Sequence, residues 1–165
     1  VLRLLESETV DQVVLSTESE LIARQVADLG VRVLERPLSL ASDDIPSVPV
    51  FRHIVSHFPC EVHVNYNINF PICPLDVFDR AIDVARRSER GESLSVPFAV
   101  WAQTARCLED YGDPWNIRAE RFADHRIKGP DVHTEADLLE AHRLAQDGGR
   151  PWWDPGETCE SGENE

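Results

Sequence analysis

Short apolar runs alternate along the chain with longer segments in which apolar residues recur at helical spacing. Residues 12–15, 31–34 and 61–65 are typical of buried strands, because they are short, rich in Val and Leu, and bounded by polar residues. A helix is expected between the first two strands, closed by Gly30. This alternation predicts an α/β fold with crossover helices, in which residues 61–65 form a central strand.

The same pattern continues in the second half of the chain. Helices are expected over residues 48–58 and from Leu75 to Ala85, a strand over residues 93–100, and a short strand over residues 115–119. Thr134 then begins a last helix, and Asp137 follows it at the spacing of a capping box.

Polar residues gather where predicted strands end. Asn65, Asn67 and Asn69 follow or end the strand at 61–65, and strand alternation would place them on one face. Amides in such a row suit sugar hydroxyls or the edge of a nucleotide base. The alternative is that they are turn-forming residues beside Pro71.

The composition of the chain limits the kinds of protein and partner that need to be considered. The chain has 165 residues, 42% of them hydrophobic, which is enough for one globular core. A formal charge of -14 argues against a nucleic-acid partner, because phosphate backbones require a basic surface. No apolar run approaches the roughly 20 residues that span a bilayer, and the start has no signal-peptide pattern.

A cytoplasmic protein is therefore expected, with no membrane partner. The four cysteines form no Cys-x-x-Cys pair, so we expect reduced thiols and no zinc. The domain is expected over residues 1–146, and residues 147–165, rich in Gly, Pro and Glu, are expected to form an acidic disordered tail.

Several motifs occur in an order that resembles one enzyme family, the cytidylyltransferases that make CMP-activated acylneuraminate or keto-deoxy-octulosonate. The resemblance covers most of residues 1–146 and is weakest between 101 and 128. It is carried by Val-Val-Leu-Ser-Thr-Glu-Ser-Glu-Leu-Ile-Ala at 13–23, Arg-Pro-Leu-Ser-Leu-Ala-Ser-Asp at 36–43, His53, Pro-Ile-Cys-Pro-Leu at 71–75, and Asp-Val-His-Thr-Glu-Ala-Asp-Leu at 131–138.

The resemblance implies a fold and a reaction. The fold would be a three-layer sandwich of the Rossmann-like nucleotide-diphospho-sugar transferase type, with a mostly parallel sheet that lacks its first strand. The reaction would join CTP to an acidic sugar, giving CMP-sugar and pyrophosphate, with Mg²⁺ or Mn²⁺ as cofactor. A homodimer would be compatible with it.

The resemblance also implies roles for individual residues. Arg36, Ser42 and Asp43 would contact the nucleotide. Asn67 and Asn69 would contact the sugar, and Asp131 and His133 would bind the metal.

Two departures from the family bear on catalysis. The Gly-, Arg- and Lys-rich loop that holds the triphosphate has no counterpart, and Val1 would lie inside the first helix, so a fragment is expected. Asn69 and His133 stand where the family has acids, and both are weaker Mg²⁺ ligands than a carboxylate. Two alternatives therefore remain open: a non-catalytic relative that binds a sugar or a partner, and a nucleotidyltransferase for another base or sugar.

Overall fold

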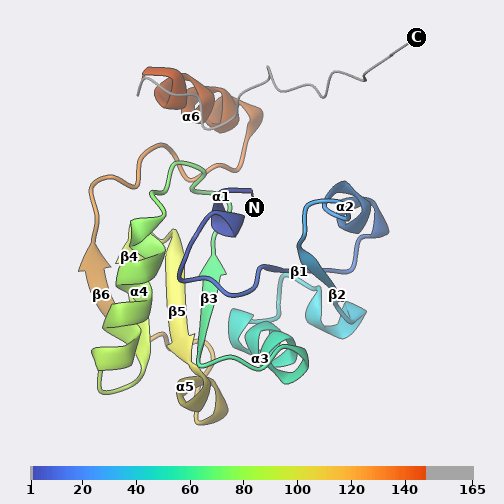
Figure 1. The fold of residues 1–165 in the computed structure, drawn as a ribbon, viewed down its shortest axis with the longest axis vertical. Helices are drawn as coiled ribbons and strands as arrows, with labels where there is room; N and C mark the ends of the chain where they lie inside the picture. The colour runs from blue at the N-terminus through green and yellow to red at the C-terminus, as the bar shows by residue number, and fades with distance from the viewer. Residues whose placement is uncertain (1, 148–165) are drawn as a thin grey trace.

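A computed structural model describes residues 2–147 of the chain (Figure 1). Its first part contains a small two-stranded sheet, in which β1 and β2 pair in parallel with Val14 opposite Arg32. Ser19 caps the helix between these strands by accepting a hydrogen bond from the Ile22 amide, and Gly30 turns the chain with a φ of 72°. The elements of this part are α1 (Leu2–Leu5), β1 (Val14–Thr17), α2 (Glu20–Gln25) and β2 (Arg32–Glu35).

The second part is built around a four-stranded sheet with the order β3-β5-β4-β6. β5 runs antiparallel to both of its neighbours, and β4 and β6 are parallel. The carboxyl ends of β3, β4 and β6 therefore lie at the same end of the sheet. The elements are η1 (Leu38–Leu40), α3 (Ser47–His57), β3 (Val62–Tyr66), α4 (Asp76–Arg87), β4 (Glu92–Val96), β5 (Val100–Thr104), α5 (Ala105–Glu109), β6 (Glu120–Ala123) and α6 (Glu135–Asp147).

The α/β class is confirmed, but the expected mostly parallel sheet is wrong: residues 2–147 form two sheets, and the larger one is mixed. The predicted strand at 93–100 is divided by a turn at Pro97 into β4 and β5, which reverses the chain. β3, expected to be central, lies at the edge of its sheet. The strand expected at 115–119 is found instead at Glu120–Ala123.

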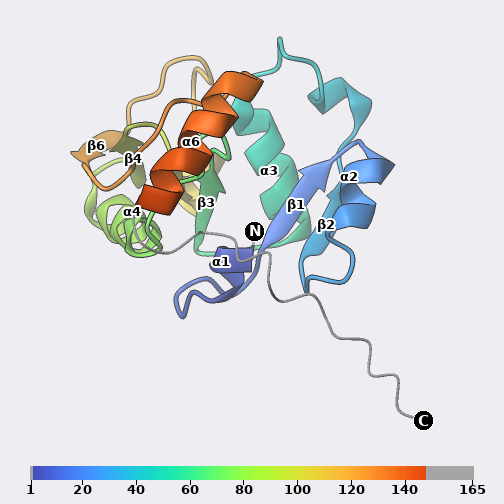
Figure 2. The ribbon, with the colours of Figure 1, turned by 90° about the horizontal axis from the view of Figure 1, so that it is seen from above.

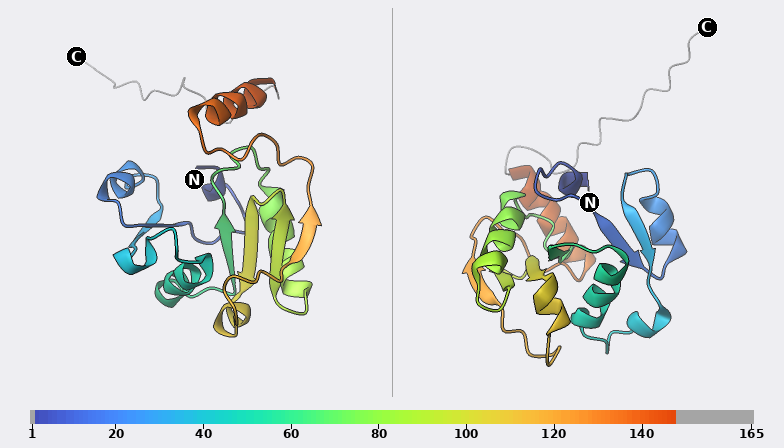
Figure 3. Two further views of the ribbon diagram at one scale, coloured as in Figure 1. Left: turned by 180° about the vertical axis from the view of Figure 1, so that it is seen from behind. Right: turned by 60° about the horizontal axis from the view of Figure 1, so that its bottom comes forward.

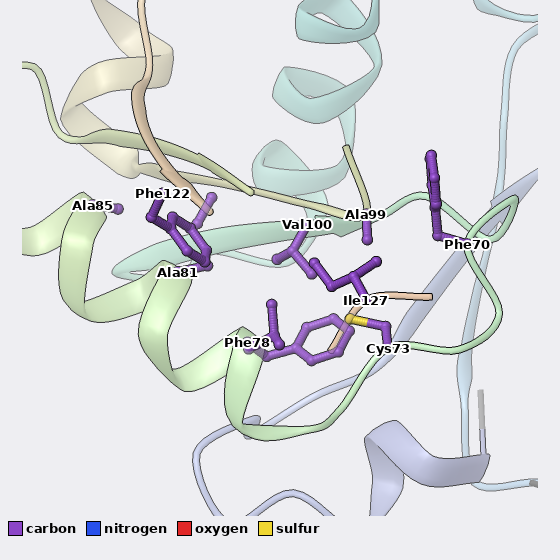
Figure 4. Close-up of a cluster of buried hydrophobic side chains, with 11 residues drawn as sticks. Phe70, Cys73, Phe78, Ala81, Ala85, Ala99, Val100, Phe122 and Ile127 are labelled. Carbon is purple, nitrogen blue, oxygen red and sulfur yellow. The ribbon is translucent and has the colours of Figure 1, made fainter. Parts of the chain in front are cut away.

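Helix α4 packs on one face of the larger sheet. Its side chains Val77, Ala81 and Ala85 are fully buried, and small residues at helical spacing let the helix approach the strands closely. Val100 and Phe122 meet them from β5 and β6 (Figure 4). This cluster is the main core of the molecule.

Helices α3 and α5 cover the opposite face. Phe51 of α3 contacts Trp101 of β5 edge to face, with ring centroids 5.2 Å apart, and Leu94 and Leu108 complete the cluster. Trp101 alternates with Val100 along β5, so the strand contributes to both cores.

The loops after β3, β4 and β6 meet beneath α6 (Figure 2). Ser95 organises the β4–β5 turn, because its hydroxyl accepts hydrogen bonds from the Ala99 and Val100 amides and donates to the Pro97 carbonyl. α6 lies across this end of the sheet, and its Ala141 and Ala145 are buried (Figure 3).

A buried carboxylate follows β6. The Asp124 side chain is only 2% exposed and accepts from Arg126 at 2.8 Å, with Arg80 at 3.5 Å. Hydrogen bonding to Arg126 lowers the pKa of Asp124 to about 2. Arg126 also pairs with Asp76 at 2.8 Å, which ties the loop after β6 to the start of α4.

Cys60 and Cys107 are free thiols, and Cys73 is buried. Of the tail expected from 147 to 165, Asp147 ends α6, and the rest, with Cys159, lies outside the described residues. Within residues 2–147, every helix is too short or too polar to cross a bilayer.

The Asp124 ion pair makes stability depend on pH. Asp124→Asn should lower the free energy of unfolding by about 1–2 kcal/mol at pH 7, after allowing for solvent around the half-exposed arginines. Because the folded pKa lies below the unfolded one, this stability is present above about pH 4 and is lost as the pH falls towards 2. Urea unfolding of both proteins from pH 7 to pH 2 measures the effect; a wild type–mutant difference that stays constant with pH would contradict it. Asp28→Asn, at an exposed position, is the control.

Gly91 allows a close approach between β4 and β5. Its φ is 69°, and a Cβ atom there would lie 2.2 Å from the Thr104 hydroxyl, which caps α5 by accepting from the Cys107 amide. Gly91→Ala should therefore cost about 2 kcal/mol or more, through left-handed strain and loss of the cap.

Variants at Gly30 and Gly112 distinguish the effect of left-handed backbone strain from the effect of the clash with Thr104. Gly30 shares the positive φ but has open space around it, so Gly30→Ala should cost about 1 kcal/mol. Gly112 has open space and no positive φ, so Gly112→Ala should change stability by less than about 0.5 kcal/mol. Denaturant unfolding of the three variants tests the order; equal effects at Gly91 and Gly30 would exclude the clash.

Candidate functional site at the carboxyl ends of β3 and β6

The structure joins two segments that are far apart in sequence. The Val132 amide donates to the Asn69 carbonyl at 2.9 Å, so the loop after β3 lies against the segment that leads into α6. This hydrogen bond brings Asn69 beside Asp131 and His133, which flank Val132. Four of the residues expected to form a site, Asn67, Asn69, Asp131 and His133, are therefore gathered at one end of the larger sheet.

Asp131 and His133 face one another. His133 Nε2 lies 3.2 Å from Asp131 Oδ1, and the two side chains are 66% and 49% exposed respectively. Alternation along the extended backbone places them on the same side of Val132. The pair presents a carboxylate oxygen, which can accept a hydrogen bond, and an imidazole ring to the solvent.

The start of α6 fixes the backbone of His133. Asp137 accepts hydrogen bonds from the amides of His133 and Thr134, at 3.1 and 2.9 Å, and the Asp137 amide donates to the Thr134 hydroxyl. This is the capping box expected from the sequence. Its hydrogen bonds, above all that from the Thr134 hydroxyl, lower the pKa of Asp137.

Asn67 and Asn69 differ in their surroundings. β3 ends at Tyr66, so neither lies on the strand, and the alternation expected for them does not apply. The Asn67 side chain holds the turn, accepting from the Asn69 amide at 3.2 Å and donating to the Phe98 carbonyl at 3.1 Å. The Asn69 side chain makes no hydrogen bond to the described residues and is the freer of the two to meet a ligand.

Arg36, Ser42 and Asp43 are placed in and after the loop that follows β2. Arg36 pairs with Glu18, and its guanidinium lowers the pKa of that carboxyl. The Ser42 hydroxyl accepts from the Asp44 amide at 3.4 Å, and Asp43 is exposed. No hydrogen bond or ion pair within residues 2–147 connects these three residues to the four beneath α6.

The residues at this end do not fit a metal held by the protein alone. Asp131 contacts the His133 imidazole, whereas the Asp137 carboxylate is engaged in the capping box. Among the described residues, no group of three or more His, Cys, Asp or Glu is placed to hold an ion. Mg²⁺ prefers several oxygen ligands in octahedral geometry. The expected Mg²⁺ or Mn²⁺ site stays a prediction, and we assign no chemical step to it.

Comparison with models of known protein families finds no family that matches, and comparison with curated proteins finds no match either. The geometry of the chain itself therefore has to carry any functional conclusion.

Some contributors to the site were not expected from the sequence. The Phe98 carbonyl holds Asn67, and Ser95 fixes the turn that presents it. Both act through hydrogen bonds with backbone groups, which cannot be predicted from a pattern of residue types. Glu18, the partner of Arg36, is separated from it by 18 residues and carries no motif beyond acidity.

The capping box should control how firmly His133 is held. Asp137→Ala should destabilise the protein and speed hydrogen exchange of the His133 and Thr134 amides, which lose their acceptor. Glu135→Ala is the matched control, because Glu135 carries the same charge in the same helical turn without these hydrogen bonds. Equal exchange rates in the two variants would show that charge, and not capping, orders the segment.

Proposed function

We propose that this chain is a non-catalytic relative of the CMP-sugar cytidylyltransferases, and that it binds an acidic sugar at the carboxyl ends of β3 and β6. The hydrogen bond from Val132 to Asn69 is the observation that carries the proposal. It assembles an amide, a carboxylate and an imidazole from two separate loops, and such polar groups recognise the hydroxyls of a sugar ring.

The binding mode follows from what each side chain leaves free. The Asn69 amide offers both donors and an acceptor, Asp131 accepts from sugar hydroxyls, and His133 donates through an imidazole N–H. Asn67 keeps one N–H and one lone pair beyond its bonds within the turn. The sugar carboxylate would lie on the side of His133.

Catalysis of nucleotidyl transfer is disfavoured by the charges at this end. Transfer to the α-phosphorus requires groups that neutralise the charge developing on phosphate oxygens. Arg126, the arginine nearest to the site along the chain, is already engaged by Asp124 and Asp76, and Arg36 is engaged by Glu18. Binding of CTP and catalysis of nucleotidyl transfer are therefore the less favoured hypothesis.

The proposal also includes the fold type, the cellular location and the oligomeric state. The Rossmann-like nucleotide-diphospho-sugar transferase fold is proposed on the resemblance, together with the parallel pairing of β1 with β2 and of β4 with β6. A cytoplasmic location and a homodimer are proposed on the resemblance and composition alone.

Titration calorimetry of the full chain with N-acetylneuraminate and with keto-deoxy-octulosonate tests the binding proposal. One of them should bind, and Asn69→Ala or Asp131→Ala should weaken it roughly tenfold, as expected for loss of one or two hydrogen bonds to a ligand. Ser42→Ala, in the loop between η1 and α3, should leave the affinity unchanged. Binding of neither sugar would refute the proposal.

Pyrophosphate release separates the binding and enzymatic readings. The chain should release none from CTP, GTP, ATP or UTP with either sugar, in the presence of Mg²⁺ or Mn²⁺. Release that is abolished by Asp131→Ala would replace the binding proposal with the enzymatic one.

A further inference from the structure

A second site is present at the opposite end of the larger sheet. A pocket of about 590 Å³ opens where β4 begins and β5 ends, and it extends under the segment that follows α5. Its size is that of a small-molecule site. None of the residues expected from the sequence to bind a ligand lines it.

The lining includes one buried carboxylate. Glu92 is 2% exposed, and its Oε1 accepts hydrogen bonds from Trp101 Nε1 and from the Tyr111 hydroxyl, both at 2.8 Å. Glu92 Oε2 accepts no hydrogen bond from the described residues. A carboxylate with one unsatisfied oxygen is costly to bury, so a donor in the pocket would be bound favourably.

Two arginines at the pocket have no acidic partner. Arg90 makes no hydrogen bond or ion pair with the described residues, and Arg118 meets only the neutral amide oxygen of Asn116, at 3.1 Å. The other two arginines of the lining are engaged: Arg86 with Glu61 at 2.9 Å, and Arg106 with Asp110 at 3.8 Å. Arg90 and Arg118 therefore keep their donors for an anion.

The lining holds four acids for its four arginines, but none of these acids forms an ion pair with Arg90 or Arg118 among the described residues. Asp110 is the partner of Arg106, and Asp113 accepts from the Trp115 amide at 3.0 Å. Glu89 is exposed at the rim. A cationic donor for Glu92 would meet four guanidinium groups, so a neutral hydroxyl is the better match.

The pocket is suited to binding and not to covalent chemistry. Burial, followed by the nearby Glu92 carboxylate, raises the pKa of Cys107 to about 11, so its thiol stays protonated at neutral pH. Burial and the hydrogen bond to Glu92 raise the pKa of Tyr111, which keeps its hydroxyl a donor.

We propose that this pocket binds a phosphorylated sugar or polyol, with a hydroxyl on Glu92 and the phosphate on Arg90 and Arg118. Each charged group of the pocket then meets its complement: the free carboxylate oxygen accepts a hydroxyl, and the two unpaired guanidinium groups bind phosphate oxygens. The site is independent of the one proposed beneath α6.

Calorimetry of the full chain with glucose 6-phosphate, glucose and inorganic phosphate tests the proposal. Glucose 6-phosphate should bind, and both fragments should bind at least roughly tenfold more weakly, because each offers only half of the contacts. Arg90→Ala and Arg118→Ala should each weaken glucose 6-phosphate binding about tenfold or more. Absence of glucose 6-phosphate binding, or equal binding of inorganic phosphate, would overturn the proposal.

Variants locate the binding and exclude a general loss of structure. Glu92→Gln keeps an oxygen for Trp101 and Tyr111 but weakens the acceptor for the hydroxyl, so it should reduce binding of glucose 6-phosphate and not of inorganic phosphate. Arg24→Ala, which removes an exposed arginine paired only with Glu20, and Asp131→Ala should leave binding unchanged. Loss of binding in Asp131→Ala, or unchanged binding in both Arg90→Ala and Arg118→Ala, would place the ligand elsewhere. Unfolding curves of each variant confirm that the compared proteins are folded.

Discussion

The antiparallel position of β5 between β3 and β4 is the constraint on which the rest of the structure depends. It makes β3, β4 and β6 point the same way, although the chain reverses between β4 and β5. It also gives the molecule two chemically distinct ends. At one end the loops after three strands converge beneath α6; at the other, the first residue of β4 and the last residue of β5 come together.

β5 can hold this position because it is buried on both faces. Val100 and Ala102 pack toward α4, and Trp101 packs toward α3. A strand with charged residues on either face would leave one helix without an apolar surface to cover. The Trp101 indole also donates to Glu92, so the strand that separates the two ends also holds the buried carboxylate of the pocket.

The two ends differ in how their charges are satisfied. Beneath α6, the buried Asp124 is matched by Arg126 and Arg80, and the groups left for a ligand, Asp131 and His133, are exposed. At the opposite end, a buried carboxylate keeps one free oxygen while two arginines keep their donors. Water competes less for the buried Glu92 than for the exposed Asp131 and His133, whereas Arg90 and Arg118 are exposed like the groups beneath α6.

Local patterns in the sequence determined much of this protein. The capping box of Thr134 and Asp137 and the helix from Leu75 to Ala85 were both predicted, because neighbours along the chain determine them. The tertiary structure alone decided that β3 is an edge strand, that β4 and β5 are separate, that Val132 meets Asn69, and that Glu92 lies in a pocket with Arg118. These features depend on contacts between residues that are distant in sequence. The free energy of such a contact depends on the surfaces that the rest of the fold buries around it.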